Sequence, residues 1–127
     1  VKDSTGWCYV DENGYMIYNQ WVKDSTGYCY VDESGYMVYE QWVEDSVGWC
    51  YVDESGYMVY SKWIYIEDEE HWYYVDASGY RVENQWKKIG NYEYYFKEDG
   101  IMAADEWIGN YYVNKDGAWV PNYVENE

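Results

Sequence analysis

Hydrophobic and polar residues alternate over short stretches of the chain, and acidic turns that end in glycine separate these stretches. The run Y-C-Y-V from Tyr28 to Val31 is aromatic and β-branched, which favours a strand. Asp32 to Gly35 follows, with Asp first and Gly fourth, as is typical of a hairpin turn closed by a left-handed glycine. Tyr36 to Tyr39 (Y-M-V-Y) then predicts the returning strand. The next stretch, Glu40 to Gly48, is expected to link this hairpin to the following one.

The same pattern recurs at a fixed period. Its glycines Gly14, Gly35 and Gly56 are spaced 21 residues apart, and three segments align around them: Trp7–Met16, Tyr28–Met37 and Trp49–Met58. No unit of such an array can bury its apolar face alone, so neighbouring units must stack. The later glycines follow at spacings of 23, 21 and 17: Gly79, Gly100 and Gly117. We therefore expect one all-β repeat domain over residues 1–127, a solenoid of about six hairpins, regular over 1–80 and degenerate over 81–127.

A column of tryptophans accompanies the glycines: Trp21, Trp42, Trp63, Trp86 and Trp107. The first unit lacks this residue, because V-K-D-S-T-G at residues 1–6 repeats the V-K-D-S-T-G at 22–27 that follows Trp21. The sequence therefore predicts a fragment of a longer array.

The composition supplies aromatic rings where most proteins use aliphatic side chains. There are 20 Tyr and 9 Trp but a single Phe, and leucine is absent, which argues against a helical core. The net charge of −17 argues against nucleic acid as a partner. No run of 18 apolar residues predicts a membrane span, and residues 1–127 contain no stretch with the pattern of a signal peptide.

The sequence offers little for metal or cofactor binding. Cys8, Cys29 and Cys50 hold the same place in successive units, and we expect small buried apolar residues there, without disulfides or a zinc site. The acidic run Glu67 to Glu70 is expected to be a solvated loop, with calcium binding as the alternative. His71, the single histidine, is expected at a strand edge on the surface. We predict no cofactor.

Within each unit, alternation divides the aromatic residues between two faces. In the third unit Trp49 and Tyr51 share one face, and Cys50 and Val52 the other. The whole pattern, W-V-x-D-x-x-G-W-x-Y-V-D-x-x-G-x-M, resembles the choline-binding, or cell-wall-binding, repeats of Gram-positive surface proteins and phage lysins. It is also similar to the related glucan-binding and clostridial-toxin repeats. The resemblance implies a left-handed superhelix of hairpins, with choline held between consecutive hairpins by aromatic side chains.

Carried over to this sequence, the resemblance implies cages in which two aromatics of one repeat meet a tyrosine of the next. The three expected sets are Trp42 and Trp49 with Tyr74, Trp21 and Tyr28 with Tyr51, and Trp63 and Trp72 with Tyr95. Met37 and Met58 occupy the G-x-M position of the family and are expected to line these cages.

Several positions depart from the family pattern. The cysteines replace the middle aromatic of W-Y-Y, and we expect them to face away from the cages. Glu93 and Asn110 replace the leading aromatic of the fifth and sixth units, and Arg81 replaces the methionine of the fourth. We therefore expect a C-terminal third without sites, and a binding region between Trp21 and Tyr95.

These observations favour a non-catalytic binding module, because the carboxylates recur in turns and form no unique constellation. The first hypothesis is recognition of choline on a cell-wall polymer, outside the cell at its surface. A carbohydrate ligand stacked on the rings is the second, and a structural or adhesive array whose rings form only a core is the third. The open ends of a cut solenoid also predict end-to-end self-association.

Overall fold

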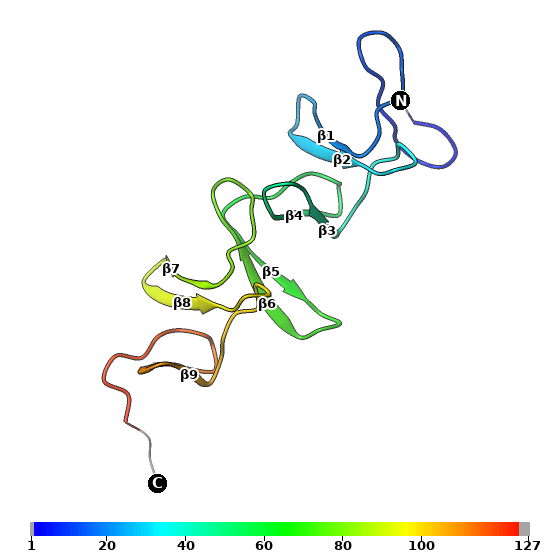
Figure 1. Ribbon diagram of the computed structural model, residues 1–127. Helices are drawn as coiled ribbons and strands as arrows, with labels where there is room; N and C mark the ends of the chain where they lie inside the picture. Colours follow the sequence, from blue (N-terminus) through cyan, green and yellow to red (C-terminus); the bar gives the residue numbers. More distant parts are fainter. Residues whose placement is uncertain (1, 125–127) are drawn as a thin grey trace. The chain divides into compact units, whose positions relative to one another are not determined.

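The computed structural model describes residues 2–124, and these residues form β-hairpins without any helix (Figure 1). Ten strands make five antiparallel two-stranded sheets. The pairs are β1 (Gln20–Lys23) with β2 (Tyr28–Val31), β3 (Gln41–Glu44) with β4 (Trp49–Val52), β5 (Lys62–Ile66) with β6 (His71–Val75), β7 (Gln85–Ile89) with β8 (Tyr92–Phe96), and β9 (Glu106–Ile108) with β10 (Tyr111–Val113). The predicted all-β hairpin class is confirmed.

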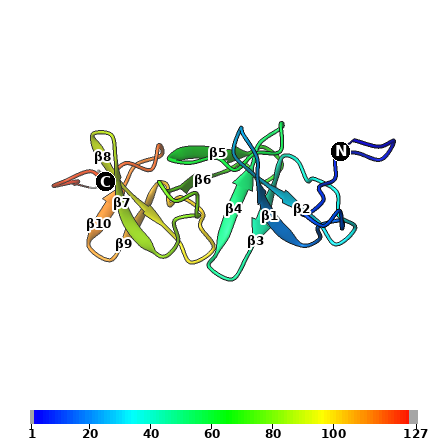
Figure 2. The same ribbon diagram turned by 90° about the horizontal axis from the view of Figure 1, so that it is seen from above.

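The strands pair differently from the sequence prediction. The strand that carries the column tryptophan pairs with the Y-C-Y-V-type strand, across the stretch that we expected to be a link (Figure 2). Trp42 lies directly opposite Tyr51, and their ring centroids are 5.1 Å apart at 73°. The expected returning strand, Tyr36 to Tyr39, forms isolated bridges only: Met37 with Val31, and Tyr36 with Cys8 of the preceding repeat. The aromatic cross-strand pair thus decides which segments form the sheet, because such pairs are the main stabilising contacts of a two-stranded sheet.

Aspartates shape both kinds of turn. In the loop between β3 and β4, Asp45 Oδ1 accepts hydrogen bonds from the backbone N–H groups of Val47 and Gly48, at 2.8 and 3.1 Å. In the predicted acidic turn, Gly35 has a φ of 85° and donates its N–H to the Asp32 carbonyl at 3.0 Å. The prediction of a turn with a left-handed glycine is therefore confirmed at this position.

The chain divides into two compact units, Val1–Ser61 with Ala77–Tyr80 and Lys62–Asp76 with Arg81–Glu127. The last residue of the second strand is wholly buried in each of the five sheets. These residues are Val31 and Val52 in the first unit, and Val75, Phe96 and Val113 in the second. Val10, which precedes the first acidic turn, is instead 48% exposed. The repeat therefore places one core residue at the same point of these five hairpins.

Glycine also allows successive repeats to approach closely. Gly79 has a φ of 89°, and a Cβ atom there would lie 2.6 Å from the Met58 sulfur and 3.2 Å from the Tyr60 ring. Gly56 is covered in the same way by Met37. The methionine of each G-x-M motif thus packs on the turn of the next repeat, which has no room for a side chain.

In the first unit, tyrosine hydroxyl groups bind the loop aspartates of earlier hairpins. Tyr57 donates to Asp24 at 2.7 Å, and Tyr80 donates to Asp45 at 2.8 Å. The Tyr57 hydroxyl, with the N–H of Thr26, lowers the pKa of the Asp24 carboxyl below its ordinary value. The hydrogen bond to Asp45 raises the pKa of Tyr80 to about 12. These bonds connect residues more than thirty positions apart and fix the stacking of the repeats.

The predicted burial of the cysteines is confirmed for Cys29 and Cys50, which have no exposed surface, while Cys8 is half-buried. No disulfide joins the three thiols. Cys29 forms a bridge with Tyr57, and Cys50 forms one with Tyr80. A small side chain therefore faces a large one at these positions.

We expect Gly79→Ala to lower the free energy of unfolding by about 1–3 kcal/mol more than Gly14→Ala does, because only the first adds overpacking to the strain of a positive φ. Gly14 is a matched control, since its φ is 85° and a Cβ there meets nothing within 4 Å. Urea unfolding followed by tryptophan fluorescence measures both variants. Equal losses would contradict the close packing described for Met58.

Asp24→Asn should make the first unit less stable at neutral pH, with a difference that vanishes in acid. A carboxyl whose pKa is lower in the folded than in the unfolded state stabilises the fold at pH values above its unfolded-state pKa. This stabilisation is lost as the pH falls through the folded-state pKa. The measurement is urea unfolding of both proteins from pH 7 down to about pH 2, and the difference should shrink as the carboxyl becomes protonated in the folded state. Glu33→Gln, which removes an exposed charge of the same unit, is the control. A destabilisation by Asp24→Asn that is equal at both limits would refute this role for the carboxylate.

Candidate functional site

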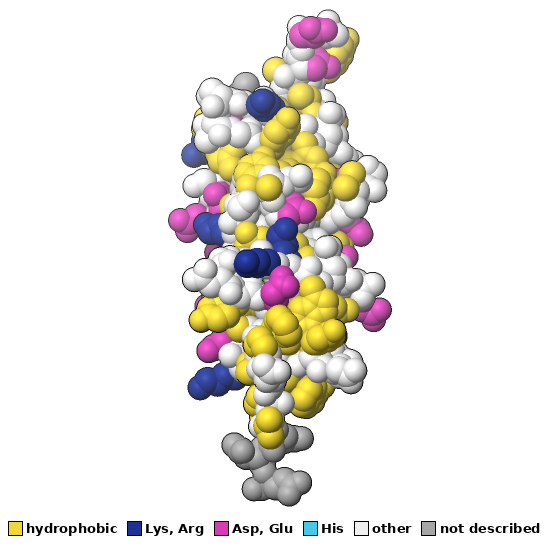
Figure 3. All heavy atoms as spheres, turned by 90° about the vertical axis from the view of Figure 1, so that its left-hand side faces the viewer, with side chains coloured by type: hydrophobic (Ala, Val, Ile, Leu, Met, Phe, Trp, Pro, Cys, Tyr) yellow, Lys and Arg dark blue, Asp and Glu magenta, His cyan; other side chains and the backbone are white. Residues whose placement is uncertain are grey.

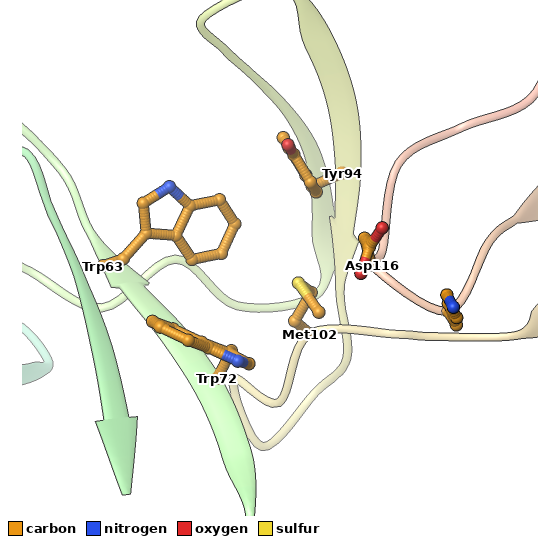
Figure 4. A pocket seen from close by; sticks show the side chains of 6 residues that line it. Trp63, Trp72, Tyr94, Met102 and Asp116 are labelled. Carbon is orange, nitrogen blue, oxygen red and sulfur yellow. The ribbon is translucent and has the colours of Figure 1, made fainter.

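The second unit contains a cavity of about 350 Å³ whose walls are mostly aromatic. Trp63 and Trp72 come from the hairpin β5–β6, whereas Tyr94 comes from β8 and Met102 from the segment after it (Figure 4). The ring of Trp63 meets Trp72 at 6.1 Å and 90°, and it meets Tyr94 at 4.9 Å and 77°. Nearly perpendicular rings that meet at their edges form the corners of a box. We call this box pocket A.

Backbone contacts between consecutive repeats hold the walls of pocket A in place. The Met102 N–H donates to the Trp72 carbonyl at 2.9 Å, which brings the methionine against the preceding hairpin. Phe96, wholly buried, packs on Trp63 with ring centroids 5.7 Å apart. Trp72 keeps 41% of its surface exposed, so the box is open to solvent on that side.

A second cavity of about 320 Å³ lies in the same unit and is lined by Trp86, Glu93, Tyr111 and Trp119. Tyr111 meets Trp86 at 5.9 Å and 82°, and it meets Trp119 at 5.9 Å and 79°. The Trp119 N–H donates to the Glu93 carbonyl at 2.8 Å, in the way that Met102 bonds to Trp72. We call this cavity pocket B. It repeats the construction of pocket A one repeat later.

The tyrosine that closes pocket A is Tyr94, and the expected Tyr95 does not line it. Tyr95 lies directly opposite Trp86 in its own hairpin, with ring centroids 5.3 Å apart. Strand alternation then turns Tyr94 toward the preceding repeat. The middle position of W-Y-Y thus supplies the third wall of this cavity, whereas we expected it to face away from the cages.

The same pairing changes the other expected cages. Tyr51 packs on Trp42 of its own hairpin, so it does not join Trp21. Trp21 instead contacts Tyr30 at 5.2 Å and donates its indole N–H to Asp45 at 3.1 Å.

The third expected cage combines Trp42 and Trp49 with Tyr74. Tyr74 packs on Trp63 of its own hairpin at 5.2 Å, and the two tryptophans belong to the other compact unit. This cage stays a prediction.

The two methionines expected in cages have identifiable surroundings. Met37 lines a cavity of about 380 Å³ in the first unit, together with Trp7, Tyr9, Asp24 and other residues. Met58 donates its N–H to the Tyr28 carbonyl at 2.8 Å and packs on the turn at Gly79. Both therefore lie against a neighbouring repeat, and their expected place in the cages stays a prediction.

Charged groups lie beside pocket A. Lys115 and Asp116, both exposed, line it with opposite charges, and Figure 4 shows Asp116 on the side of Met102 and Tyr94. Arg81 is held elsewhere, with its guanidinium 5.4 Å from the Tyr73 ring and 2.8 Å from the Glu83 carboxylate. Arg81, which replaces the methionine of the fourth unit, therefore does not line this pocket.

The acidic loop and the histidine match their expected surroundings. Residues 67–70 are exposed, and Glu69 accepts a hydrogen bond from the Tyr73 hydroxyl at 2.7 Å. His71 begins β6, an edge strand of its two-stranded sheet, and is exposed, which confirms its expected place. Within residues 2–124, no group of three His, Cys, Asp or Glu side chains could hold a metal ion. Nor does this part of the chain form a helix long and apolar enough to cross a membrane.

The sequence interpretation missed five of the aromatic and methionine side chains that line the two pockets: Trp86, Tyr94, Met102, Tyr111 and Trp119. Met102 and Trp119 stand two residues after Gly100 and Gly117, in the G-x-M register, so the spacing could have found them. We expected a C-terminal third without sites, yet both pockets use residues beyond Tyr95, which makes this part of the chain a candidate for binding.

Comparison with known proteins agrees with this location. A family model described as a choline-binding repeat matches residues 80–119, and a model of a cell wall binding repeat matches residues 61–81. The matched stretch lies mostly in the part that we expected to be degenerate. Comparison with curated protein sequences gives no match.

Several solved structures share the fold. The choline binding domain of Spr1274 from Streptococcus pneumoniae is 30% identical, over 62% of this chain and 92% of that one, with a TM-score of 0.57. The modular Cpl-1 endolysin, solved with a peptidoglycan analogue, is 33% identical over 96% of this chain, with a TM-score of 0.62. Alternansucrase from Leuconostoc mesenteroides is 26% identical over 80% of this chain, with a TM-score of 0.72.

This chain belongs to the choline-binding repeat family, whose members include cell-wall-binding modules. It spans only 36% of the endolysin chain and 10% of the alternansucrase chain.

The side chain at the middle position of W-Y-Y and the one bridged to it differ in size between repeats, which gives a test of pocket A. Tyr94 forms a bridge with Ala118, whereas Cys50 forms one with Tyr80, so large and small side chains trade places between repeats. We expect Tyr94→Cys and Ala118→Tyr each to destabilise the protein by about 1–3 kcal/mol, one by lost packing and the other by overpacking. The double variant should recover about 1 kcal/mol or more relative to the sum of the two losses. Strictly additive losses in urea unfolding would show that the two side chains do not share this space.

Proposed function

We propose that this chain binds quaternary ammonium groups of the choline type, and that pocket A is a binding site. The observation that carries the proposal is the arrangement of Trp63, Trp72 and Tyr94 as three walls of one box, completed by Met102. Its support is the match of this stretch to choline-binding repeats.

A quaternary ammonium suits such a box on physical grounds. It has no N–H to donate, so it gains nothing from hydrogen-bond acceptors and is attracted by the electron-rich faces of rings. Each ring contributes about 0.5–2 kcal/mol, with the larger values in desolvated sites. The methionine adds a polarisable, adaptable wall against the methyl groups. The net charge of −17 adds a long-range attraction for cations.

One open pocket of this kind binds weakly, and a polymer strengthens binding through several sites. When two linked groups reach two pockets together, avidity exceeds the single-site affinity by about 100-fold or more. This is why we place the ligand on a cell-wall polymer and the protein outside the cell, at its surface. The chain itself acts in this proposal as a binding module without catalysis.

A carbohydrate is the second candidate ligand. It is supported by the likeness to alternansucrase, whose structure has been solved in complex with isomaltotriose and aligns with a TM-score of 0.73. Sugar rings stack on tryptophan faces, and hydroxyl groups would find Lys115 and Asp116 beside pocket A. The ammonium group of choline needs no hydrogen bond from the protein, whereas a sugar does. A direct comparison of the two ligands therefore separates the two candidate functions.

We expect Trp72→Ala to weaken choline binding at pocket A by about tenfold or more, because one ring of the box is removed. Stability should change little, since this side chain is 41% exposed. The measurement is a choline titration of the ¹⁵N-labelled protein, followed by the indole N–H signal of Trp63.

Tyr65→Ala is the matched control, because Tyr65 is 44% exposed and contacts Trp72 but does not line the pocket. A Trp63 signal that ignores choline in the unaltered protein, yet moves with isomaltotriose, would favour the carbohydrate. A signal that ignores both would overturn the proposed function.

A further inference from the structure

Pocket B differs from pocket A at two lining positions. It still has three aromatic rings, and it has a carboxylate in addition. The leading aromatic, Trp72 in pocket A, is replaced by Glu93, and the methionine position, Met102 in pocket A, is taken by Trp119. Tyr111 forms the middle wall and stands nearly perpendicular to both Trp86 and Trp119. The ring lost at Glu93 is therefore regained at Trp119, and the carboxylate joins a complete aromatic box.

The Glu93 carboxylate is available to a ligand. Among residues 2–124, no side chain or backbone group donates a hydrogen bond to it or forms an ion pair with it. Lys88 is its cross-strand neighbour on the same face of β7–β8, but the two do not come within ion-pair distance. Glu93 is half-buried, so its charge is less screened here than that of an exposed glutamate.

Hydrophobic side chains also reach the surface of the protein outside the pockets. Figure 3 shows hydrophobic side chains exposed on the face that it draws, interrupted by separate acidic and basic groups. Tyr111 is 52% exposed, which leaves the pocket open to a small ligand.

We infer that pocket B is a site for organic ammonium ions that retain an N–H, such as tertiary or primary amines in their protonated form, in preference to quaternary ones. The rings attract the cation and its alkyl groups, and Glu93 accepts the hydrogen bond that the N–H requires once water is displaced. A quaternary ion gains the charge attraction but leaves the carboxylate without a donor, which is costly for a partly desolvated acceptor. This inference rests on the proposed function, because it takes both pockets to be sites for organic cations. It assigns quaternary ions to pocket A and ions with an N–H to pocket B.

Two probes differ only at the nitrogen: choline, and protonated N,N-dimethylethanolamine, which has N–H in place of one methyl group. Titration of the ¹⁵N-labelled full chain with each probe gives separate affinities, from the indole signals of Trp86 and Trp119 for pocket B and of Trp63 and Trp72 for pocket A. We expect the ratio of the choline Kd to the dimethylethanolamine Kd to be about tenfold higher at pocket B than at pocket A. Glu93→Gln, which keeps the shape but removes the charge, should abolish this difference and leave pocket A unchanged. Lys88→Gln is the control for a change of charge on the same face.

Each outcome decides the question. Equal ratios at the two pockets, a ratio at pocket B that survives Glu93→Gln, or Trp86 and Trp119 signals that respond to neither probe would overturn the inference. The ratio in the unaltered protein needs no variant, so the test stands even if Glu93→Gln perturbs folding. A silent pocket A with a responsive pocket B would refute pocket A as the choline site, and the ratio at pocket B before and after Glu93→Gln would then test the inference by itself.

Discussion

A two-stranded hairpin has no interior, and this constraint governs the structure. Each hairpin holds a tryptophan opposite a tyrosine, as in the pair Trp63 and Tyr74, but one pair of rings covers only part of the sheet. The remaining apolar face must be covered by the next repeat along the chain. The next repeat supplies Tyr94 and Phe96 on one side and Met102 on the other. The cover is incomplete, and the uncovered corner between the rings is pocket A.

The repeats cover the apolar faces of their hairpins in two ways. In the first unit, cysteine at the middle position leaves room for a tyrosine of the following repeat, whose hydroxyl binds a loop aspartate, as Tyr80 binds Asp45. In the second unit the middle position is itself a tyrosine, its bridge partner is Ala118, and the ring becomes a pocket wall. The regular repeats are therefore tied together by hydrogen bonds between tyrosine and aspartate, while in the more divergent ones the middle tyrosine itself lines the cavity.

Much of the fold could be predicted from the sequence. The period of the glycines, the missing leucine and the aromatic strands were enough for an all-β array of hairpins, with buried cysteines and left-handed glycines in the turns. The strand pairing could not be predicted, because alternation alone does not say whether Tyr28 to Val31 pairs with the segment before it or with the one after it. The contact between Trp21 and Tyr30 decides the matter, and it is visible only in three dimensions.

The wrong expectation of strand pairing also affected which residues we expected in the cages. Once Tyr95 is known to face Trp86, alternation turns Tyr94 toward the preceding repeat, and the pocket walls follow. Trp63 and Trp72 were nevertheless identified from the sequence as two of the walls, because they lie within one hairpin and did not depend on the stacking of the next.

The central claim is that a cation lies between consecutive hairpins, against a tyrosine from the middle position of the second. Nuclear Overhauser effects between the methyl protons of choline and the aromatic protons of the full chain test it most directly. The account predicts effects at Trp63, Trp72 and Tyr94 and none at Tyr95. Effects at Tyr95 without Tyr94, or none at any of these rings when choline is in large excess, would contradict it.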